Sequence, residues 1–302
     1  MSVPGAAADA AVTVTSAVLR SWPLPPPGVG KEARGRTCVV GGSERTPGAA
    51  LLAAEAALRC GAGKLQVATT AATAPALGVA LPEALVLGLP ANDEGGIDPS
   101  CGARGSELAE LAGGAHAVCL GVGTVGEEAV VALLEALVPP LRCTVVLDAM
   151  GLAPVTRDAT FLHHLRGRAV LTPNLSELAI VLGAEEGEVE RDTASAALEL
   201  ARRSRCAVAA GGGESWIAAP DGRLWCDASG GAGLGVSGSG DVLAGIVTGL
   251  CARGADPVQA AVWACHLHGR AGDRLASSVG RLGFLARELP AEVPRVLAEV
   301  EV

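Results

Sequence analysis

The sequence predicts a three-layer α/β/α domain with a central, mostly parallel β-sheet. From residue 37 onward, short aliphatic runs alternate with longer segments of helical periodicity. Strands that alternate with helices form βαβ units, which place helices on both faces of a parallel sheet. Half of the 302 residues are hydrophobic but only 2% are aromatic. The core must therefore be built from Ala, Val and Leu side chains.

Strands are expected where a short aliphatic run is bounded by glycine, proline or polar residues. These runs cover residues 37–40, 64–68, 117–120, 144–147, 169–171, 207–210 and 215–218. Helices are expected where apolar residues recur every three or four positions. Such segments cover residues 47–60, 127–137, 176–182, 193–203, 241–251 and 257–275.

One domain accounts for nearly the whole chain. Residues 1–18 are rich in Ala, Thr and Ser and are interpreted as a loose N-terminal tail. Residues 19–302 contain no repeat and no clear linker, which indicates a single domain with a proline-rich, extended start.

The charge and the cysteines exclude several classes of protein. The net charge of −9, with no basic cluster, argues against nucleic acid or an anionic membrane as a partner. Nine cysteines are scattered without a C-x-x-C pair, which favours buried thiols in a reducing cytoplasm over disulfides or zinc. The N-terminus lacks the early basic region of a signal peptide. We therefore expect a cytoplasmic protein with no metal centre ligated by its own side chains.

The segment "GLGVSGSGDVLAG", residues 233–245, places five glycines around Asp241. Gly238, Ser239 and Gly240 are expected to form the first turn of a helix, whose free N–H groups and dipole attract an anion. A carboxylate beside such an anion site can remove a proton from a hydroxyl that attacks a bound phosphoryl group. The simpler interpretation is an Asp that only complements the helix dipole.

A second glycine pattern suggests a different enzyme. Gly121, Gly123 and Gly126 match G-x-G-x-x-G, and Asp148 follows at the end of the next strand. This arrangement is typical of NAD-dependent dehydrogenases. The alternative is a tight turn that lets a ligand approach the backbone, and Asp148 is equally consistent with a loop residue that caps its neighbours.

Three further features have both a structural and a functional interpretation. The helix expected after Pro47 would offer free N–H groups near Ala49 to a ligand. Asn174, in "VLTPNLSEL", is either a ligand-binding amide or a helix N-cap. His266 and His268 lie two residues apart on a helical pattern, so they cannot share one face and do not indicate a metal site.

Taken together, these stretches resemble the ADP/ATP-dependent NAD(P)H-hydrate dehydratases, which have a ribokinase-like fold. The resemblance runs from about Pro23 to the C-terminus and includes "VVGGSERTPGAALLAAEAALRCGAGK", "LTPNLSEL", "GSGDVLAGIVTGL" and "HGRAGD". It implies a lyase that removes water from the S-form of hydrated NADH or NADPH, with ADP or ATP as phosphoryl donor and Mg²⁺ as cofactor. It also implies a homo-oligomer.

The resemblance assigns roles to individual residues. Asp241 would be the catalytic base. Ala49, Gly123, Asn174 and Asp241 would contact the hydrated dinucleotide. The nucleotide would be bound by Gly211, Gly212, Gly213, Glu214, Ser215, Gly238, Ser239 and Gly240.

Two positions depart from the family pattern. Asn174 replaces a histidine, and an amide cannot shuttle a proton. Gly211 replaces a lysine, which removes a charge-assisted phosphate contact worth about 1.5–3 kcal/mol unless Lys64 or an arginine substitutes. The missing lysine leaves open a nucleotide-binding protein with weakened catalysis. The G-x-G-D helix start, which is shared across the fold, leaves open a small-molecule hydroxyl kinase.

Overall fold

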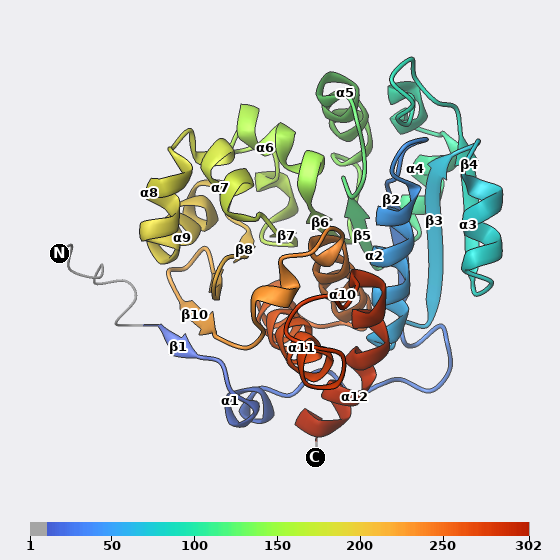
Figure 1. Ribbon diagram of the computed structural model, residues 1–302. Coiled ribbons are helices and arrows are strands. Elements are labelled where there is room, and N and C mark those ends of the chain that lie inside the picture. Colours follow the sequence, from blue (N-terminus) through green and yellow to red (C-terminus); the bar gives the residue numbers. More distant parts are fainter. Residues whose placement is uncertain (1–10, 302) are drawn as a thin grey trace.

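One mixed β-sheet runs through the molecule and carries helices on both faces (Figure 1). The computed structural model describes residues 11–301, and within this range the sheet has ten strands in the order β1-β10-β9-β8-β7-β6-β5-β2-β3-β4. The strands are β1 (Val12–Thr13), β2 (Arg36–Val40), β3 (Lys64–Thr70), β4 (Ala84–Leu89), β5 (Ala117–Leu120), β6 (Thr144–Leu147), β7 (Ala169–Leu171), β8 (Ala207–Ala210), β9 (Ser215–Ala218) and β10 (Leu224–Asp227). Every pairing is parallel except those of β9 with β8 and β10.

The helices form one layer on each face of the sheet. One layer contains α1 (Ser16–Ser21), α2 (Pro47–Arg59), α3 (Ala74–Ala80), α10 (Ser239–Ala252), α11 (Pro257–Ser278) and α12 (Leu289–Glu301). The other contains α4 (Glu107–Gly113), α5 (Glu127–Leu137), α6 (Ala153–Arg157), α7 (Leu175–Leu182), α8 (Glu186–Arg191) and α9 (Thr193–Ser204). The predicted three-layer α/β/α class is therefore confirmed. None of the described helices combines the length and the apolar character needed to cross a membrane.

Alternation along the strands divides the interior into two aliphatic cores. On β2, Val39 packs with the layer of α2 and α10, whereas Cys38 and Val40 pack with the layer of α4 and α5. Helices α2 and α10 approach closely because the residues at their contact are small. A Cβ on Gly245 of α10 would overlap the carbonyl oxygen of Ala53 on α2. Small residues thus replace the missing aromatic side chains in filling this layer.

The strand order places one crevice at the carboxyl ends of the parallel strands. β2 lies between β5 and β3, so the direction of strand succession reverses beside it. In open α/β sheets, ligands bind outside the carboxyl ends of the strands at such a switch point. The loops that begin at Gly41, Gly121, Asp148, Thr172 and Gly211 all leave the sheet at this edge.

The seven predicted strands and six predicted helices are present, most with bounds shifted by one to three residues. The sequence prediction omitted β1, β4 and β10 and the helices α1, α3, α4, α6, α8 and α12. Most of these elements are short, so their periodic signal is weak.

The predicted loose tail over residues 1–18 needs correction where the structure describes it. β1 pairs with β10, and Thr15 accepts a hydrogen bond from Val18 N at 3.2 Å at the start of α1. Leu19 of α1 is fully buried. This order depends on pairing with a strand some 210 residues away, which the local composition does not indicate. Residues 1–10 lie outside the described residues.

Candidate active site

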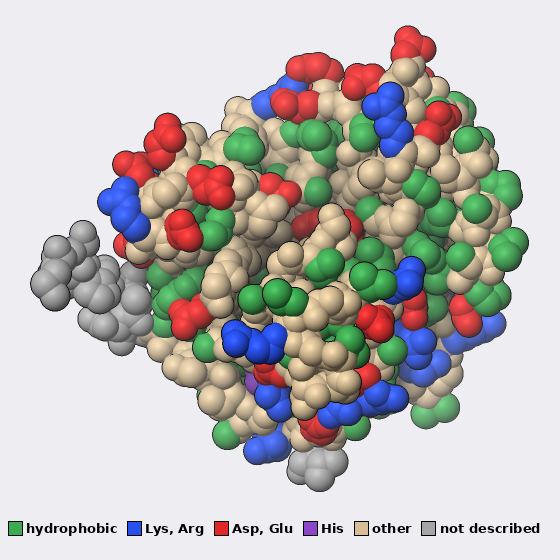
Figure 2. Space-filling model, in the orientation of Figure 1, with side chains coloured by type: hydrophobic (Ala, Val, Ile, Leu, Met, Phe, Trp, Pro, Cys, Tyr) green, Lys and Arg blue, Asp and Glu red, His purple; other side chains and the backbone are tan. Residues whose placement is uncertain are grey.

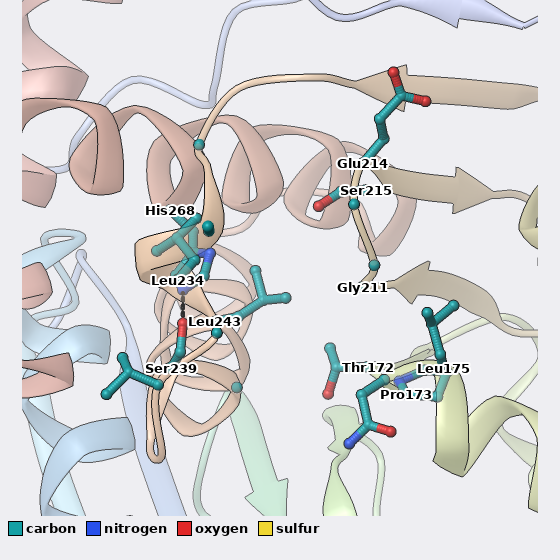
Figure 3. Close-up of a pocket in the computed structure, with 18 of the residues that line it drawn as sticks. Thr172, Pro173, Leu175, Gly211, Glu214, Ser215, Leu234, Ser239, Leu243 and His268 are labelled. Carbon is teal, nitrogen blue, oxygen red and sulfur yellow. Dashed lines mark hydrogen bonds between the residues drawn. The ribbon is translucent and has the colours of Figure 1, made fainter. Parts of the chain in front are cut away.

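A cavity of about 860 Å³ opens at the carboxyl edge of the sheet, beside the N-terminus of α10 (Figure 3). It is lined by residues 172–176, 186, 211–215, 229–232, 234–240, 243 and 268. The predicted nucleotide-binding residues Gly211, Gly212, Gly213, Glu214, Ser215, Gly238, Ser239 and Gly240 all belong to this lining, as does Asn174. The fold therefore brings together the loop after β8, which begins at Gly211, and the segment after β10, which extends to Gly240, 29 residues further along the chain.

The N-terminus of α10 is shaped by a glycine that no other residue could replace without strain. Gly238 is the N-cap and has a φ of 91°, a left-handed value that L side chains rarely adopt. A Cβ at this position would lie 2.5 Å from Leu52 Cδ1. Ser239 N donates to the Val236 carbonyl oxygen at 3.1 Å, and no side chain caps the helix, so the N–H groups of Gly240 and Asp241 are the ones offered to an anion.

Asp241 lies in this first turn and is half-buried. Burial raises its pKa to about 6, and the nearby negative charge of Glu177 adds to the increase. An Asp with this pKa is ionised at neutral pH but holds a proton more readily than an ordinary carboxylate. These are the properties of a general base.

Two more acids lie near Asp241. Asp148 is 5% exposed, and burial raises its pKa to about 8, although the Thr172 hydroxyl donates to its Oδ1 at 2.6 Å and opposes the increase. Burial also raises the pKa of Glu177, and hydrogen bonds with Asn174 oppose this. Burial is therefore the main cause of the raised pKa at all three acids, and the charge of Glu177 adds to it at Asp148 and Asp241.

Asn174 has the N-cap role that the sequence suggested. Its Oδ1 accepts from Glu177 N at 2.9 Å, and its own N–H donates to Glu177 Oε2 at 3.0 Å, which completes a capping box. The exposed side chain nevertheless lines the cavity, and its NH₂ group makes no hydrogen bond among the described residues. Capping and ligand binding are thus compatible at this residue.

Ala49 and Gly123 meet at the switch point. Gly123 has a φ of 63°, and a Cβ there would lie 2.5 Å from Ala49 Cβ. The Thr46 hydroxyl donates to the Gly123 carbonyl oxygen at 2.7 Å and joins the two loops. Neither residue lines the 860 Å³ cavity. Asp241, the predicted base, also lies outside this lining, so Asn174 is the one predicted substrate residue that lines the cavity. Ala49 and Gly123 form a second group, next to α10 through the packing of α2 on that helix.

The surroundings of the G-x-G-x-x-G turn do not fit a dehydrogenase. In such enzymes the N-terminus of the following helix binds a pyrophosphate. Here that helix is α5, and its first-turn residues Glu127 and Glu128 both bind Arg157. Asp148, which would bind a ribose hydroxyl, is buried and bonded to Thr172.

The cavity contains no cation to replace the lysine missing at position 211. Among the described residues that line it, none is Lys or Arg, whereas Glu186 and Glu214 are acidic. Lys64 is the first residue of β3, at the opposite edge of the sheet, and forms an ion pair with Glu32. Figure 2 shows that Lys and Arg side chains on this face lie mostly toward its lower part, away from the central hollow. Lys64 therefore cannot substitute for the lysine.

Over residues 11–301, no group of three or more His, Cys, Asp or Glu side chains is arranged to hold a metal ion.

Several residues of the site had no predicted role from the sequence. His268 lines the cavity, although neither histidine was predicted to bind a ligand. Residues 229–237 and Thr172 were assigned no role, although "GLGVSGSGDVLAG" contains residues 233–237 and "LTPNLSEL" contains Thr172.

Comparisons with known proteins agree with this geometry. A family model described as NAD(P)H-hydrate dehydratase matches residues 37–295. The chain is 47% identical over 287 residues to the ADP-dependent (S)-NAD(P)H-hydrate dehydratase of Xanthomonas campestris pv. campestris, an alignment that covers 94% of this chain and 96% of that protein. It is 32% identical over 267 residues to the bifunctional NAD(P)H-hydrate repair enzyme of Escherichia coli, of which it spans 47%.

Solved structures extend the comparison to three dimensions. The ADP/ATP-dependent NAD(P)H-hydrate dehydratase of Bacillus subtilis, co-crystallised with ATP and Mg²⁺, superposes with a TM-score of 0.81 at 28% identity, over 96% of this chain and 99% of that one. A hydroxyethylthiazole kinase from Pyrococcus horikoshii reaches 0.58 at 20% identity, which shows the ribokinase-like fold alone. With the family model, the curated relative and the enzyme structure in agreement, this chain belongs to the NAD(P)H-hydrate dehydratase family.

Proposed function

We propose that this chain restores NADH and NADPH from their S-form hydrates, with ADP or ATP as phosphoryl donor and Asp241 as the catalytic base. The observation that carries the proposal is the position of Asp241. It lies in the first turn of α10, beside uncapped N–H groups, with its pKa raised to about 6. One helix end thus offers both an anion site and a proton acceptor.

The reaction follows from these two features. Asp241 accepts the proton of the ring hydroxyl, whose oxygen forms a bond to the terminal phosphorus of the nucleotide as the bond to the bridging oxygen breaks. The α10 N-terminus stabilises the negative charge that develops on the transferred group. The phosphate ester is then a good leaving group: its C–O bond breaks, phosphate departs, and loss of a ring proton completes the double bond.

Mg²⁺ fits a cavity that is to hold a nucleotide, because its described lining contains the carboxylates of Glu186 and Glu214 and no Lys or Arg. Bound with the nucleotide, it would neutralise phosphate charge. Ala49 and Gly123 would hold the hydrated dinucleotide from the switch-point side and Asn174 from within the cavity, and the glycines of 211–213 and 238–240 would hold the nucleotide. We further propose that the enzyme acts in the cytoplasm as a homo-oligomer.

The test is to incubate the protein with hydrated NADH, Mg²⁺ and either ADP or ATP, and to follow the absorbance of the restored reduced nicotinamide. We expect recovery that requires nucleotide and disappears in Asp241→Asn. Asp221→Asn is the matched control, because Asp221 is exposed, pairs with Arg223 and does not line the cavity.

Two results would contradict the proposal. Unchanged recovery in Asp241→Asn would remove Asp241 as the base. If the parent protein binds nucleotide but restores no NADH with either one, the chain is a nucleotide-binding protein without this activity.

A further inference from the structure

Helix α11 carries two buried histidines that the proposed mechanism does not use. His266 and His268 are 6% and 9% exposed. Two residues along an α-helix correspond to a rotation of about 200°, so the two side chains leave α11 in different directions. Each reaches an opposite end of the glycine-rich segment 229–238, which connects β10 to α10 and forms one wall of the cavity.

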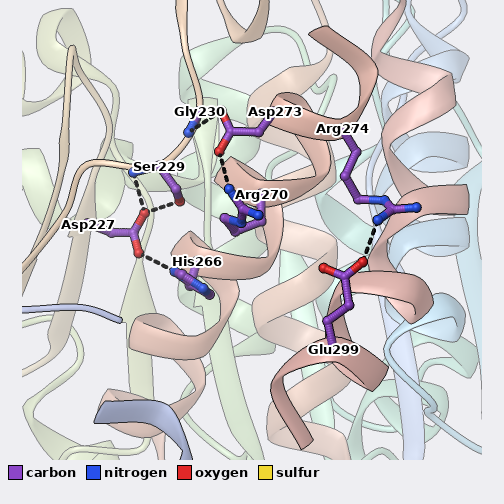
Figure 4. Close-up of polar contacts among 8 residues, drawn as sticks. All are labelled: Asp227, Ser229, Gly230, His266, Arg270, Asp273, Arg274 and Glu299. Atoms are coloured by element: carbon purple, nitrogen blue, oxygen red, sulfur yellow. Dashed lines mark hydrogen bonds and ion pairs between the residues drawn. The ribbon is translucent and has the colours of Figure 1, made fainter. Parts of the chain in front are cut away.

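His266 holds the beginning of this segment. Its Nδ1 donates to Asp227 Oδ2 at 2.7 Å, and Asp227, at the end of β10, is 1% exposed (Figure 4). The other carboxylate oxygen, Oδ1, accepts from Ser229 N at 2.9 Å and from the Ser229 hydroxyl. His266 Nε2 has no hydrogen-bond partner among the described residues, so among them the imidazole ring is held by its bond to Asp227.

His268 holds the far end of the segment. Its Nε2 lies 3.0 Å from Ser239 Oγ, in the first turn of α10 (Figure 3). Burial lowers the pKa of His268 to about 4, so the ring is neutral at physiological pH. If Nε2 carries the proton and donates to Ser239 Oγ, the Ser239 hydroxyl hydrogen is free to point into the cavity.

Between these ends, α11 also contacts the segment through Gly269, Gly272 and Asp273. Asp273 Oδ1 accepts from Gly230 N at 3.1 Å, while its Oδ2 accepts from Arg270 (Figure 4). A Cβ on Gly269 would overlap Ser229 Oγ, and a Cβ on Gly272 would lie 2.8 Å from Leu234. The "HLHGRAGD" stretch thus forms the surface against which the wall rests.

We propose that His266 and His268 are positioning residues that fix both ends of segment 229–238 in its nucleotide-binding form. The inference rests on the proposed nucleotide role of this cavity. Six glycines occur within residues 229–240, so the free segment has many conformations, and binding would have to restrict them. Anchoring both ends in the protein removes this cost from binding and directs the Ser239 hydroxyl toward a phosphate oxygen.

The two histidines use different ring nitrogens, and this difference gives a matched test. Asparagine places its amide nitrogen near the position of Nδ1, whereas glutamine reaches the position of Nε2. At residue 266, His266→Asn should therefore keep the bond to Asp227 and His266→Gln should lose it. At residue 268 the order reverses: His268→Gln should keep the bond to Ser239 and His268→Asn should lose it.

The experiment measures the Kd of the Mg²⁺ complexes of ADP and ATP by calorimetry, together with thermal unfolding, in the full chain. We expect the retaining variants to bind within about threefold of the parent and the losing variants about tenfold more weakly, the effect of one lost hydrogen bond. In the assay with hydrated NADH, the losing variants should raise the KM for nucleotide and the retaining variants should restore it. Val262→Ala, buried on the same helix but outside the cavity lining, controls for a general weakening of α11.

A double variant completes the test. In a Ser239→Ala background, His268→Asn should weaken nucleotide binding no further, because its effect passes through the Ser239 hydroxyl. The inference would be overturned if the same substitution, asparagine or glutamine, gave the tighter nucleotide binding at both positions. Equal Kd values for all four variants would also overturn it. Failure of the parent protein to restore NADH would instead refute the proposed function, so the two failures are distinguishable.

Discussion

Replacing Gly211 with lysine should tighten nucleotide binding, because it would place the only Lys or Arg among the described residues that line the cavity. The position can accept the side chain. A Cβ built at Gly211 meets no atom within 4 Å, and Gly211 is not among the glycines with a left-handed φ. Its N–H donates to the Pro173 carbonyl oxygen at 3.0 Å, a bond that lysine can also make.

The magnitude follows from the chemistry of the new contact. A charge-assisted hydrogen bond to phosphate contributes about 1.5–3 kcal/mol. Gly211 is only half-buried and its neighbours Gly212 and Gly213 are exposed, so water screens the charge. We therefore expect Gly211→Lys to strengthen nucleotide binding by the lower value of this range, about 1.5 kcal/mol, which corresponds to a roughly tenfold lower Kd. Thermal stability should change little, by about 0.5 kcal/mol or less.

Calorimetric titration with ADP and ATP, at low and high salt, measures this effect. The gain should shrink as salt rises, because exposed charges are screened. Gly211→Met, which has a side chain of similar length without charge, is the matched control. Equal tightening in Gly211→Met, or no tightening in Gly211→Lys, would refute the reasoning that the cavity lacks a cation.

Four further outcomes are expected. With Asp241 as base, kcat/KM should fall about tenfold per pH unit below its pKa of about 6, which a pH–rate profile measures. Asp148 has a folded-state pKa of about 8 against 3.8 for an unperturbed Asp, so its contribution to stability is present at low pH and lost as pH rises through 8. Asp148→Asn should therefore raise the melting temperature at alkaline pH relative to the parent, and less so at pH near 6. Asn174→Ala should cost about 1 kcal/mol of unfolding free energy through the lost N-cap, whereas Asn174→Asp should retain it. Gly123→Ala should cost about 1–3 kcal/mol, because its φ is 63° and the new Cβ meets Ala49, as denaturant titration can measure.

Each of these four predictions can be contradicted by one measurement. A flat pH–rate profile between pH 5 and 7 would be incompatible with Asp241 as the base. An identical stability difference between Asp148→Asn and the parent at every pH would show that Asp148 does not titrate in this range. Asn174→Ala as stable as Asn174→Asp would remove the capping role. A Gly123→Ala protein as stable as the parent would mean that the turn relaxes.

The local elements were predictable because their signals lie close together in the chain. Pro47 at the first position of α2, and the aliphatic run of β5 ending at Gly121, mark boundaries through residues within a few positions. The same holds for Asn174, whose cap on α7 needs only Glu177 three residues later. Short elements such as β1, by contrast, depend on a partner strand far along the chain.

The roles of the motifs depend on tertiary contacts, because a motif does not show which side chains pack against it. The G-x-G-x-x-G match by itself fits a dehydrogenase, and the structure shows the physical reason against it, because Arg157 binds Glu127 and Glu128 at the start of α5. Lys64 remained a possible phosphate ligand until it was located at the amino end of β3. Both corrections concern contacts between segments that the sequence does not order in space.

The sequence by itself determined the alternation of strands and helices, the aliphatic core, and the glycine-rich helix start that carries Asp241. These follow from local periodicity, residue size and backbone freedom. Tertiary structure alone decided the raised pKa of Asp241, the absence of Lys and Arg from the described cavity lining, and the attachment of segment 229–238 to α11. Burial, charge proximity and hydrogen bonding are properties of distances through space, and folding sets those distances between residues far apart in the chain.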